Sequence, residues 1–203
     1  MIHEHDVDLA GEGNQGGSPN PFFSIGHSTR DVPDFAALLG LAAVRVVVDV
    51  RTVPRSRTNP QFNRDALPDS LAQHGIGYEH VAELGGLRGK PRGDASSPNT
   101  FWDNQSFRNY ADYALSSDFR SGFARLREVG AERRTAIMCA EAVWWRCHRR
   151  IIADYLLAAG ASVFHILAPD NIAPARITPA ARIAATGLVY AAGTPTSNSE
   201  APR

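Results

Sequence analysis

Apolar and polar positions alternate along this chain with two different periods, which predicts a succession of strands and helices. Short apolar runs typical of buried strands occur at 22–26, 44–50, 78–81, 135–138 and 162–167. Apolar residues recur at helical spacing between them, at 32–41, 64–74, 106–115, 118–129 and 143–159. Strands that alternate with helices favour a mostly parallel sheet covered on both faces. We therefore expect a single three-layer α/β domain.

Residues that begin or end helices support these boundaries. Asp31 is a plausible N-cap for the first helix, and Ser117 could cap the helix at 118–129. Gly75 and Gly160 follow the ends of two helical segments, where glycine commonly stops a helix. Pro68 weakens the prediction for 64–74.

The composition limits the class of protein. With 203 residues, of which 43% are hydrophobic and 21% charged, the chain can bury one sizeable core. The formal net charge is +0, so no overall charge attracts nucleic acid or an anionic membrane. Two cysteines are too few for a disulfide framework, no apolar run is long enough to span a membrane, and the N-terminus lacks a signal-peptide pattern. These features predict a cytoplasmic protein with reduced thiols.

Both ends of the chain are poor in apolar residues. Residues 1–20 are polar and Gly-rich, and the last residues are rich in Gly, Pro, Ser and Thr. Such segments cannot bury enough apolar surface to offset the entropy lost on ordering. We expect disordered tails at 1–20 and 189–203 around an α/β domain at 21–188.

Polar and reactive side chains follow the predicted strands at the point where each strand ends. In chain order they are His27 and Ser28, then Asp49, Arg51, Arg55 and Arg57, then His80 and Glu83, and finally Cys139 and Glu141. The carboxyl ends of parallel strands meet at one edge of a sheet, where ligands bind in open α/β folds. We therefore expect these residues to line a common crevice.

The loop after the second strand is basic. Arg51, Arg55 and Arg57 follow the strand in a loop that is interrupted by Pro54 and Pro60, and prolines stiffen a loop. Guanidinium groups on one loop suit phosphate or carboxylate binding. The alternative is a solvated loop with Arg51 paired to an acidic neighbour.

The segment RTAIMCAEAVWWRCHRR, at 134–150, concentrates the chemistry. Cys139 would lie just before the helix expected at 143–159, where the dipole and nearby arginines favour a reactive thiolate; a structural thiol is the alternative. Six residues separate Cys139 from Arg146, and tyrosine-phosphatase-like loops have five, which argues against phosphatase chemistry. Cys147 is expected to be a shielded core thiol.

The same segment supplies further ligand and acid–base candidates. Glu141 could act as a general base, and His27 could shuttle a proton near neutral pH. His148 and Arg149 are further ligand-binding candidates. A zinc or iron site remains open, although helix neighbours point about 100° apart, which hinders joint chelation by Cys147 and His148.

A long loop at 83–105 precedes the helix at 106–115. Loops of this length are often lids over a site. Trp102, Tyr110 and Tyr113 offer stacking surfaces for a base, or else pack the helix against the sheet.

Four phrases of the sequence occur together in one family. They are SIGHSTR at 24–30, DVRTVPRSRTNPQFN at 49–63, HVAELGG at 80–86 and MCAEAVWWRCHRR at 138–150. Together they closely resemble the bacterial and archaeal family catalogued as domain of unknown function 488, over about residues 22–166. The resemblance implies that the four motifs belong together, and it brings no established activity.

Two hypotheses follow. The first is an enzyme that acts on a phosphate-bearing small molecule, a nucleotide or a nucleic-acid end, with the Arg loop holding the anion near Cys139, Glu141 and His27. The second is a module that binds a metal, a cofactor or nucleic acid in the same crevice without turnover. The sequence names neither a cofactor nor an oligomeric state.

Overall fold

The computed structural model describes residues 20–90 and 96–192, so most of the two expected tails lies outside the described residues. A six-stranded sheet forms the centre, with strand order β3-β2-β4-β1-β5-β6. The strands are β1 (Phe22–Gly26), β2 (Val46–Asp49), β3 (Gly77–His80), β4 (Thr135–Cys139), β5 (Val163–Ala168) and β6 (Asn171–Pro174). The first five are parallel, and β6 pairs antiparallel with β5. The predicted α/β class is confirmed.

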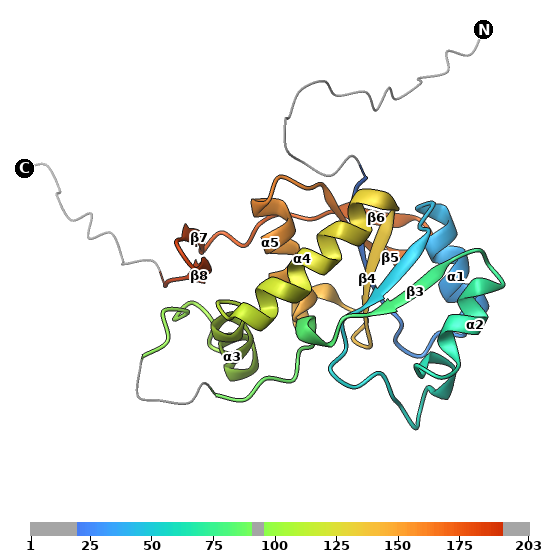
Figure 1. Ribbon diagram of the computed structural model, residues 1–203, viewed down its shortest axis with the longest axis horizontal. Helices are drawn as coiled ribbons and strands as arrows, with labels where there is room; N and C mark the ends of the chain where they lie inside the picture. Colours follow the sequence, from blue (N-terminus) through green and yellow to red (C-terminus); the bar gives the residue numbers. More distant parts are fainter. Residues whose placement is uncertain (1–19, 91–95, 193–203) are drawn as a thin grey trace, which may run out of the picture.

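Helices cover both faces of the sheet (Figure 1). The helices α1 (Val32–Leu41) and α2 (Leu67–Ala72) pack on one face, and α4 (Ser117–Glu132) and α5 (Arg149–Ala158) pack on the other with α3 (Gln105–Tyr113) beside them. Three single 3-10 turns connect these elements: η1 (Pro60–Phe62), η2 (Ala82–Leu84) and η3 (Trp144–Arg146). The domain therefore has three layers.

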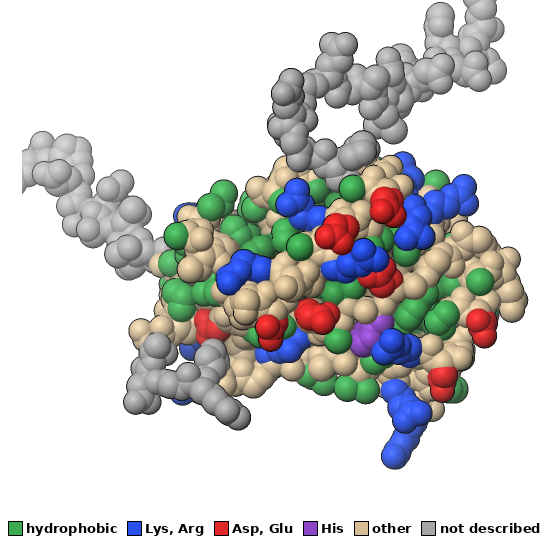
Figure 2. Space-filling view, viewed as in Figure 1, with side chains coloured by type: hydrophobic (Ala, Val, Ile, Leu, Met, Phe, Trp, Pro, Cys, Tyr) green, Lys and Arg blue, Asp and Glu red, His purple; other side chains and the backbone are tan. Residues whose placement is uncertain are grey.

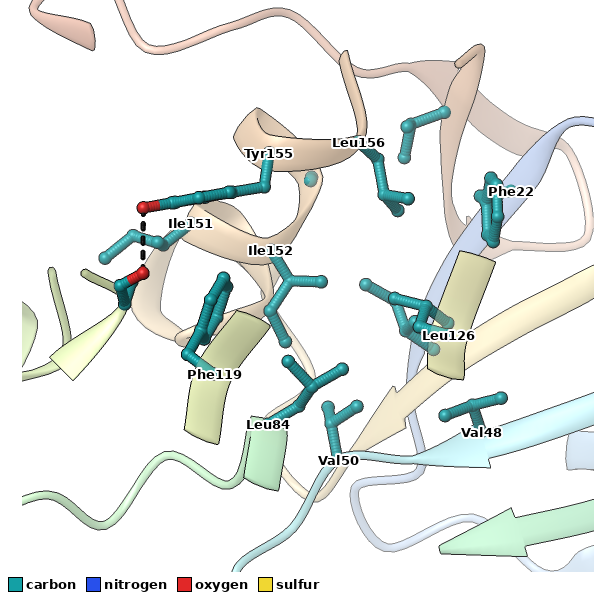
Figure 3. Close-up of a cluster of buried hydrophobic side chains, with 14 of the residues drawn as sticks. Phe22, Val48, Val50, Leu84, Phe119, Leu126, Ile151, Ile152, Tyr155 and Leu156 are labelled. Atoms are coloured by element: carbon teal, nitrogen blue, oxygen red, sulfur yellow. Dashed lines mark hydrogen bonds between the residues drawn. The ribbon is translucent and has the colours of Figure 1, made fainter. Parts of the chain in front are cut away.

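Successive residues of each central strand serve opposite faces of the sheet. Val46 and Val48 contact the cluster under α4 and α5, and Val47 between them contacts the cluster under α1 and α2. Figure 3 shows the first cluster, where Phe119 and Leu126 meet side chains from α5 and the sheet. The central strands are mostly apolar because both faces are buried.

The last long helix begins later than the sequence predicts. We expected it to run from Val143, but α5 starts at Arg149. The Trp144 ring leaves the helical stripe to stack on His165, with centroids 4.2 Å apart, and Cys147 is extended at φ −125° and ψ 147°. The segment 140–148 is therefore a connection and not a helix.

Two other helix boundaries also differ from the prediction. The helix α2 begins at Leu67, with Pro68 in its first turn, because proline fits the start of a helix and not its interior. The helix α4 is capped by Ser116, whose hydroxyl accepts from Phe119 N, and not by Ser117.

A second, two-stranded antiparallel sheet follows the main one. It consists of β7 (Ala181–Ala184) and β8 (Gly187–Tyr190), which the sequence did not indicate. Tyr190 is fully buried, and its hydroxyl donates to the Asp154 carboxylate of α5 at 3.0 Å. The backbone N–H of Tyr190 donates to Asn99 Oδ1 at 2.9 Å. The ordered fold thus continues two residues past position 188.

The chain leaves neighbouring strands toward opposite faces of the sheet. From β1 it passes to α1 on one face, and from β4 it passes to α5 on the other. Such a switch point opens a crevice outside the strand ends. The strand β4, which ends in Cys139, lies between β1 and β2 at this crevice.

Charges are mixed over the surface in view. Figure 2 shows basic and acidic side chains interspersed over this face, with no extended patch of one sign. Within the described residues, no helix is both long enough and apolar enough to cross a membrane.

Candidate functional site

A cavity of about 400 Å³ opens at the switch point, beyond the ends of β1 and β4. Its walls come from the loop after β2, the start of the loop after η2, the helix α3 and the connection from β4 to α5. Volumes of this order suit a small molecule. Among the predicted site residues, the following line it: His27, Arg51, Arg55, Cys139, Glu141, Cys147 and His148.

Gly26 allows the β4–α5 connection to cross the end of β1. A Cβ on Gly26 would collide with the carbonyl oxygen of Glu141. Backbone hydrogen bonds continue the contact, since His27 N donates to Cys139 O and Ser28 N donates to Ala140 O, each at 3.0 Å. This crossing fixes where Cys139 and Glu141 enter the cavity.

Arg51 is held by a buried ion pair. Its guanidinium donates to both oxygens of Asp49, with the shortest N–O distance 2.6 Å, and to Phe62 O at 2.6 Å. Both side chains are buried, and Tyr78 OH also donates to Asp49 at 2.7 Å. Arg51 therefore braces the loop and has little capacity left for an incoming anion.

His27 supports this ion pair. Its Nδ1 lies 2.8 Å from Ser28 O and so carries the proton, while Nε2 accepts from Arg51 Nη1 at 3.3 Å. Burial and the nearby Arg51 charge lower the pKa of His27 to about 4, although the Ser28 hydrogen bond and Asp49 oppose this shift. At neutral pH the ring is therefore uncharged and its Nε2 is engaged by Arg51, and proton transfer by His27 stays a prediction.

Two exposed arginines at the cavity have no partner among the described residues. Arg55, from the loop after β2, and Arg146, at the end of η3, both line it. Neither side chain makes an ion pair or hydrogen bond with any residue of 20–90 or 96–192. Arg57 is exposed on the same loop as Arg55 but does not line the cavity. The cavity therefore presents two free cations to an anionic ligand.

Two thiols and an imidazole meet on the cavity floor. Cys139, Cys147 and His148 each place one ligand-type atom within 4.8 Å of the others. Cys147 Sγ and His148 Nδ1 are 3.6 Å apart. The argument that helix neighbours diverge fails here, because Cys147 is extended and precedes the helix that begins after His148.

Hydrogen bonds fix the orientation of His148. Its Nε2 lies 2.8 Å from Val50 O, which can only accept, so Nε2 carries a proton and, in the neutral ring, Nδ1 keeps its lone pair. The chain at Gly86 packs on the imidazole, since a Cβ there would lie within 2.8 Å of three ring atoms. These contacts leave Nδ1 directed at the thiols.

Arg149 is the charged neighbour of Cys147. It is 1% exposed, and its Nε donates to Cys147 Sγ at 3.3 Å. Its other donors contact Ser24 Oγ at 3.3 Å and Glu141 O. No carboxylate pairs with it in the part of the chain that the structure describes.

The two thiols have opposite acidities. The hydrogen bond to Cys147 and burial raise the pKa of Cys139 well above its usual range. Burial opposes ionisation of Cys147, but the Cys139 hydrogen bond and the positive charge of Arg149 lower its pKa well below that range. We expected the more acidic thiol at Cys139 beside a helix N-terminus, whereas these shifts favour Cys147.

Glu141 lies on the cavity wall with an exposed side chain. Its Oε1 accepts from Val143 N at 3.3 Å, which turns the connection after β4. The rest of the carboxylate is free to accept a proton or to bind a ligand hydroxyl.

Several predicted site residues lie outside the cavity lining. His80 donates from Nε2 to Arg51 O at 2.8 Å, and Asp49 is buried beneath Arg51. Ser28 adopts a left-handed φ of 51° in the turn after β1, and Glu83 is exposed on η2. The strand ends do share one edge, as the pairs Gly26–Cys139 and Asp49–His80 show, but they do not all face the crevice.

The aromatic residues around α3 mainly pack the fold. Tyr110 OH donates to Leu84 O and Tyr113 OH donates to Glu83 O, each at 2.7 Å. Trp102 is buried and stacks on Phe107 with ring centroids 5.0 Å apart. Phe107 and Tyr110 line the cavity. Part of the expected lid, at 91–95, lies outside the described residues.

A family model described as Domain of unknown function DUF488 matches residues 31–156, more than half of the chain. The chain belongs to the DUF488 family. The matched range of this DUF488 protein contains three of the four motifs and omits SIGHSTR at 24–30. No curated protein and no solved structure matches the chain.

Sequence reasoning on this DUF488 chain did not select all of the cavity residues. Arg146 was named only for its spacing from Cys139, although a cation one residue before Cys147 pointed to it. Val53, Leu87 and Phe107 form apolar walls and gave no local signal of a role. They are brought together by the two loops and α3, which the sequence could not place relative to one another.

Proposed function

We propose that this DUF488 protein is an enzyme that acts on a phosphate-bearing small molecule of nucleotide size bound in the cavity. The observation that carries the proposal is the placement of unpaired Arg55 and Arg146 at a cavity whose floor holds Cys139, Cys147 and His148. Free guanidiniums suit phosphate, and the sulfur and imidazole groups supply the reactive chemistry.

The other walls suit an organic group attached to the phosphate. Val53 and Leu87 are exposed apolar residues at the cavity, and Phe107 offers an aromatic surface from α3. A nucleoside could contact these apolar walls while its phosphate meets the arginines.

The charge distribution favours a small molecule over a polymer. Binding along a nucleic-acid backbone requires several cations that follow successive phosphates. The net charge is +0, and the face in Figure 2 has no basic stripe. A nucleic-acid end is therefore the less favoured substrate.

The chemistry in this proposal belongs to the floor and to Glu141. Glu141 serves as general base toward a water or a ligand hydroxyl, since it is exposed to the cavity. The Asp49–Arg51–His27 group holds the strand ends in place beneath them. We place the protein in the cytoplasm, where thiols stay reduced.

The test uses matched arginine variants of the full chain. Binding of a panel of nucleoside mono- and diphosphates is measured by calorimetry, and turnover by chromatography of the products. We expect Arg55→Ala and Arg146→Ala each to weaken nucleotide binding about tenfold, because each removes a charged hydrogen bond. Arg57→Ala should bind as the unmodified protein does.

The role of Glu141 is tested with the phosphate compound that binds most tightly to the unmodified protein. Glu141→Gln should abolish turnover and leave binding within about threefold, which corresponds to less than 1 kcal/mol. Equal binding in the Arg55, Arg57 and Arg146 variants would overturn the anion site. Binding without turnover of any tested phosphate ester would leave the non-catalytic module as the function.

A further inference from the structure

We infer that Cys139, Cys147 and His148 form a binding site for one divalent thiophilic cation of the zinc type, with its fourth coordination position open to the cavity. The site concerns metal binding, which is measurable without substrate and does not depend on turnover.

The spacing of the three donor atoms suits a small tetrahedral ion. The two sulfurs and the ring nitrogen lie within 4.8 Å of one another. Thiolates bound to tetrahedral zinc at about 2.3 Å are roughly 3.8 Å apart. Small side-chain rotations therefore bring the donors onto one ion, and the separation of 3.6 Å between Cys147 Sγ and His148 Nδ1 already fits.

The imidazole is held with its lone pair toward the sulfurs. Val50 O accepts a hydrogen bond from His148 Nε2 at 2.8 Å, so in the neutral ring Nδ1 is the unprotonated nitrogen. Metal-binding histidines commonly donate their other ring N–H to a backbone carbonyl, which fixes tautomer and orientation. His148 has this arrangement.

Hydrogen bonds also hold the two cysteines in place. Cys139 ends β4, where its carbonyl oxygen accepts a hydrogen bond from His27 N. Cys147 Sγ accepts a hydrogen bond from Arg149 Nε at 3.3 Å. Hydrogen bonds from an outer shell are typical of metal-bound ligands. Cys147 and Arg149 are both buried, so water does not compete for this contact.

The open coordination position of the ion and the net charge of the site both favour an anion as the fourth ligand. All three donors line the cavity, so a ligand can reach the ion from that side. A divalent cation with two thiolates is neutral, and Arg149 adds one positive charge that no carboxylate balances among the described residues. Hydroxide or a phosphate oxygen would complete the site, as in catalytic zinc centres with three protein ligands.

The binding test uses the full chain, reduced and stripped with a chelator. Zn²⁺ is titrated against a competing indicator, and elemental analysis gives the stoichiometry after desalting. We expect one ion per chain. Cys139→Ser, Cys147→Ser and His148→Gln should each weaken binding by more than about 100-fold, since loss of a supporting residue alone typically costs 10- to 100-fold.

A matched control variant removes a histidine that lies outside this cavity. His74 is exposed on the turn after α2 and does not line this cavity. His74→Gln should bind Zn²⁺ as the unmodified protein does. An equal loss of affinity in His74→Gln and His148→Gln would overturn the assignment.

A spectroscopic measurement on the unmodified chain tests the metal site even if the variants fail to fold. Co²⁺ added to the unmodified chain should give intense tetrahedral bands and thiolate charge-transfer bands, which Zn²⁺ then removes. Absence of these bands, or a Cys139–Cys147 disulfide in protein prepared without chelator or added oxidant, would overturn the metal site.

The two proposals fail separately. Metal bound at one ion per chain with no turnover of phosphate esters would uphold this site and overturn the enzyme. Full turnover by chelated protein in metal-free buffer, with no Co²⁺ bands, would uphold the enzyme and overturn the metal site.

Discussion

Gly26, the last residue of β1, lies directly beneath the carbonyl oxygen of Glu141 in the connection from β4 to α5. A side chain at this position would occupy the space of that carbonyl group. The connection carries the carboxylate on the cavity wall and leads to the thiol of Cys147. The packing of one glycine thus determines how two neighbouring strands share the site.

Gly26→Ala should therefore disturb both stability and the site. We expect the free energy of unfolding to fall by about 1–3 kcal/mol, because the obstructing atoms are backbone and cannot move aside cheaply. Gly40→Ala in α1 is the control, since nothing lies within 4 Å of the place its methyl group would take and alanine favours a helix. Urea unfolding followed by circular dichroism measures both, and equal effects would contradict the prediction.

The buried pair of Asp49 and Arg51 should matter more than an exposed pair. Asp49→Asn leaves the buried guanidinium without its counter-charge, and we expect a loss of about 3–5 kcal/mol. Glu79→Gln breaks the exposed pair with Arg125 and should cost less than about 1 kcal/mol. Chemical denaturation of both variants decides between them, and similar losses would show that Arg51 is not held as described.

Replacement of Arg149 even by lysine should lower the stability of the protein. Its guanidinium reaches Cys147 Sγ, Ser24 Oγ and Glu141 O at once, which a lysine ammonium cannot do. We expect Arg149→Lys to lower the free energy of unfolding by about 1–3 kcal/mol. Arg150→Lys, which loses one partly buried hydrogen bond to Thr178 Oγ1, should cost about 1 kcal/mol. A smaller loss for Arg149→Lys than for Arg150→Lys would refute this role.

Stability should fall between pH 6.5 and pH 4 because of buried histidines. Burial, followed by the charge of Arg149, lowers the pKa of His165 from 6.5 to about 4. Above pH 6.5 both the folded and the unfolded states are neutral at this ring, so its full contribution is present. As the pH falls toward 4, the unfolded state takes up a proton that the folded state resists, and stability is lost.

The expected loss from His165 is about 3 kcal/mol across this window, from the size of the pKa shift. The pKa of His27 is lowered to the same value, so it adds a loss of the same sign. His165→Phe should remove about half of this histidine-dependent loss, whereas His74→Gln should leave the pH profile unchanged. Unfolding curves at pH 7.5, 6, 5 and 4 test this, and an unaltered slope in His165→Phe would count against it.

The strands of the main sheet were the most predictable part of the fold. The strand β1 and the helix α1 match the expected bounds, because the apolar run at 22–26 and the cap at Asp31 are local signals. The short strands β6, β7 and β8 were missed. Each of them has only 4 residues and rests on pairing that no local pattern encodes.

The sequence located the candidate site but did not predict how its residues are arranged. The apolar spacing of Trp144, Cys147 and Ile151 imitates a helix, although Trp144 turns away to stack on His165. This single error moved the helix start six residues and placed Cys139 close to a helix N-terminus. It also hid the approach of Cys147 to His148, which depends on an extended backbone.

The hairpin of β7 and β8 supports Phe107 on the cavity wall, whereas the cavity floor belongs to β4 and the connection that follows it. Tyr190 of β8 packs on Trp102 with centroids 5.1 Å apart, and Trp102 stacks in turn on Phe107 of the cavity wall. The floor of the cavity lies within the matched range 31–156, whereas β8 lies beyond it. Changes in the hairpin can therefore reshape the Phe107 wall while the cavity floor stays intact, so the proposed ligand selectivity and the proposed chemistry would rest on separate parts of the chain.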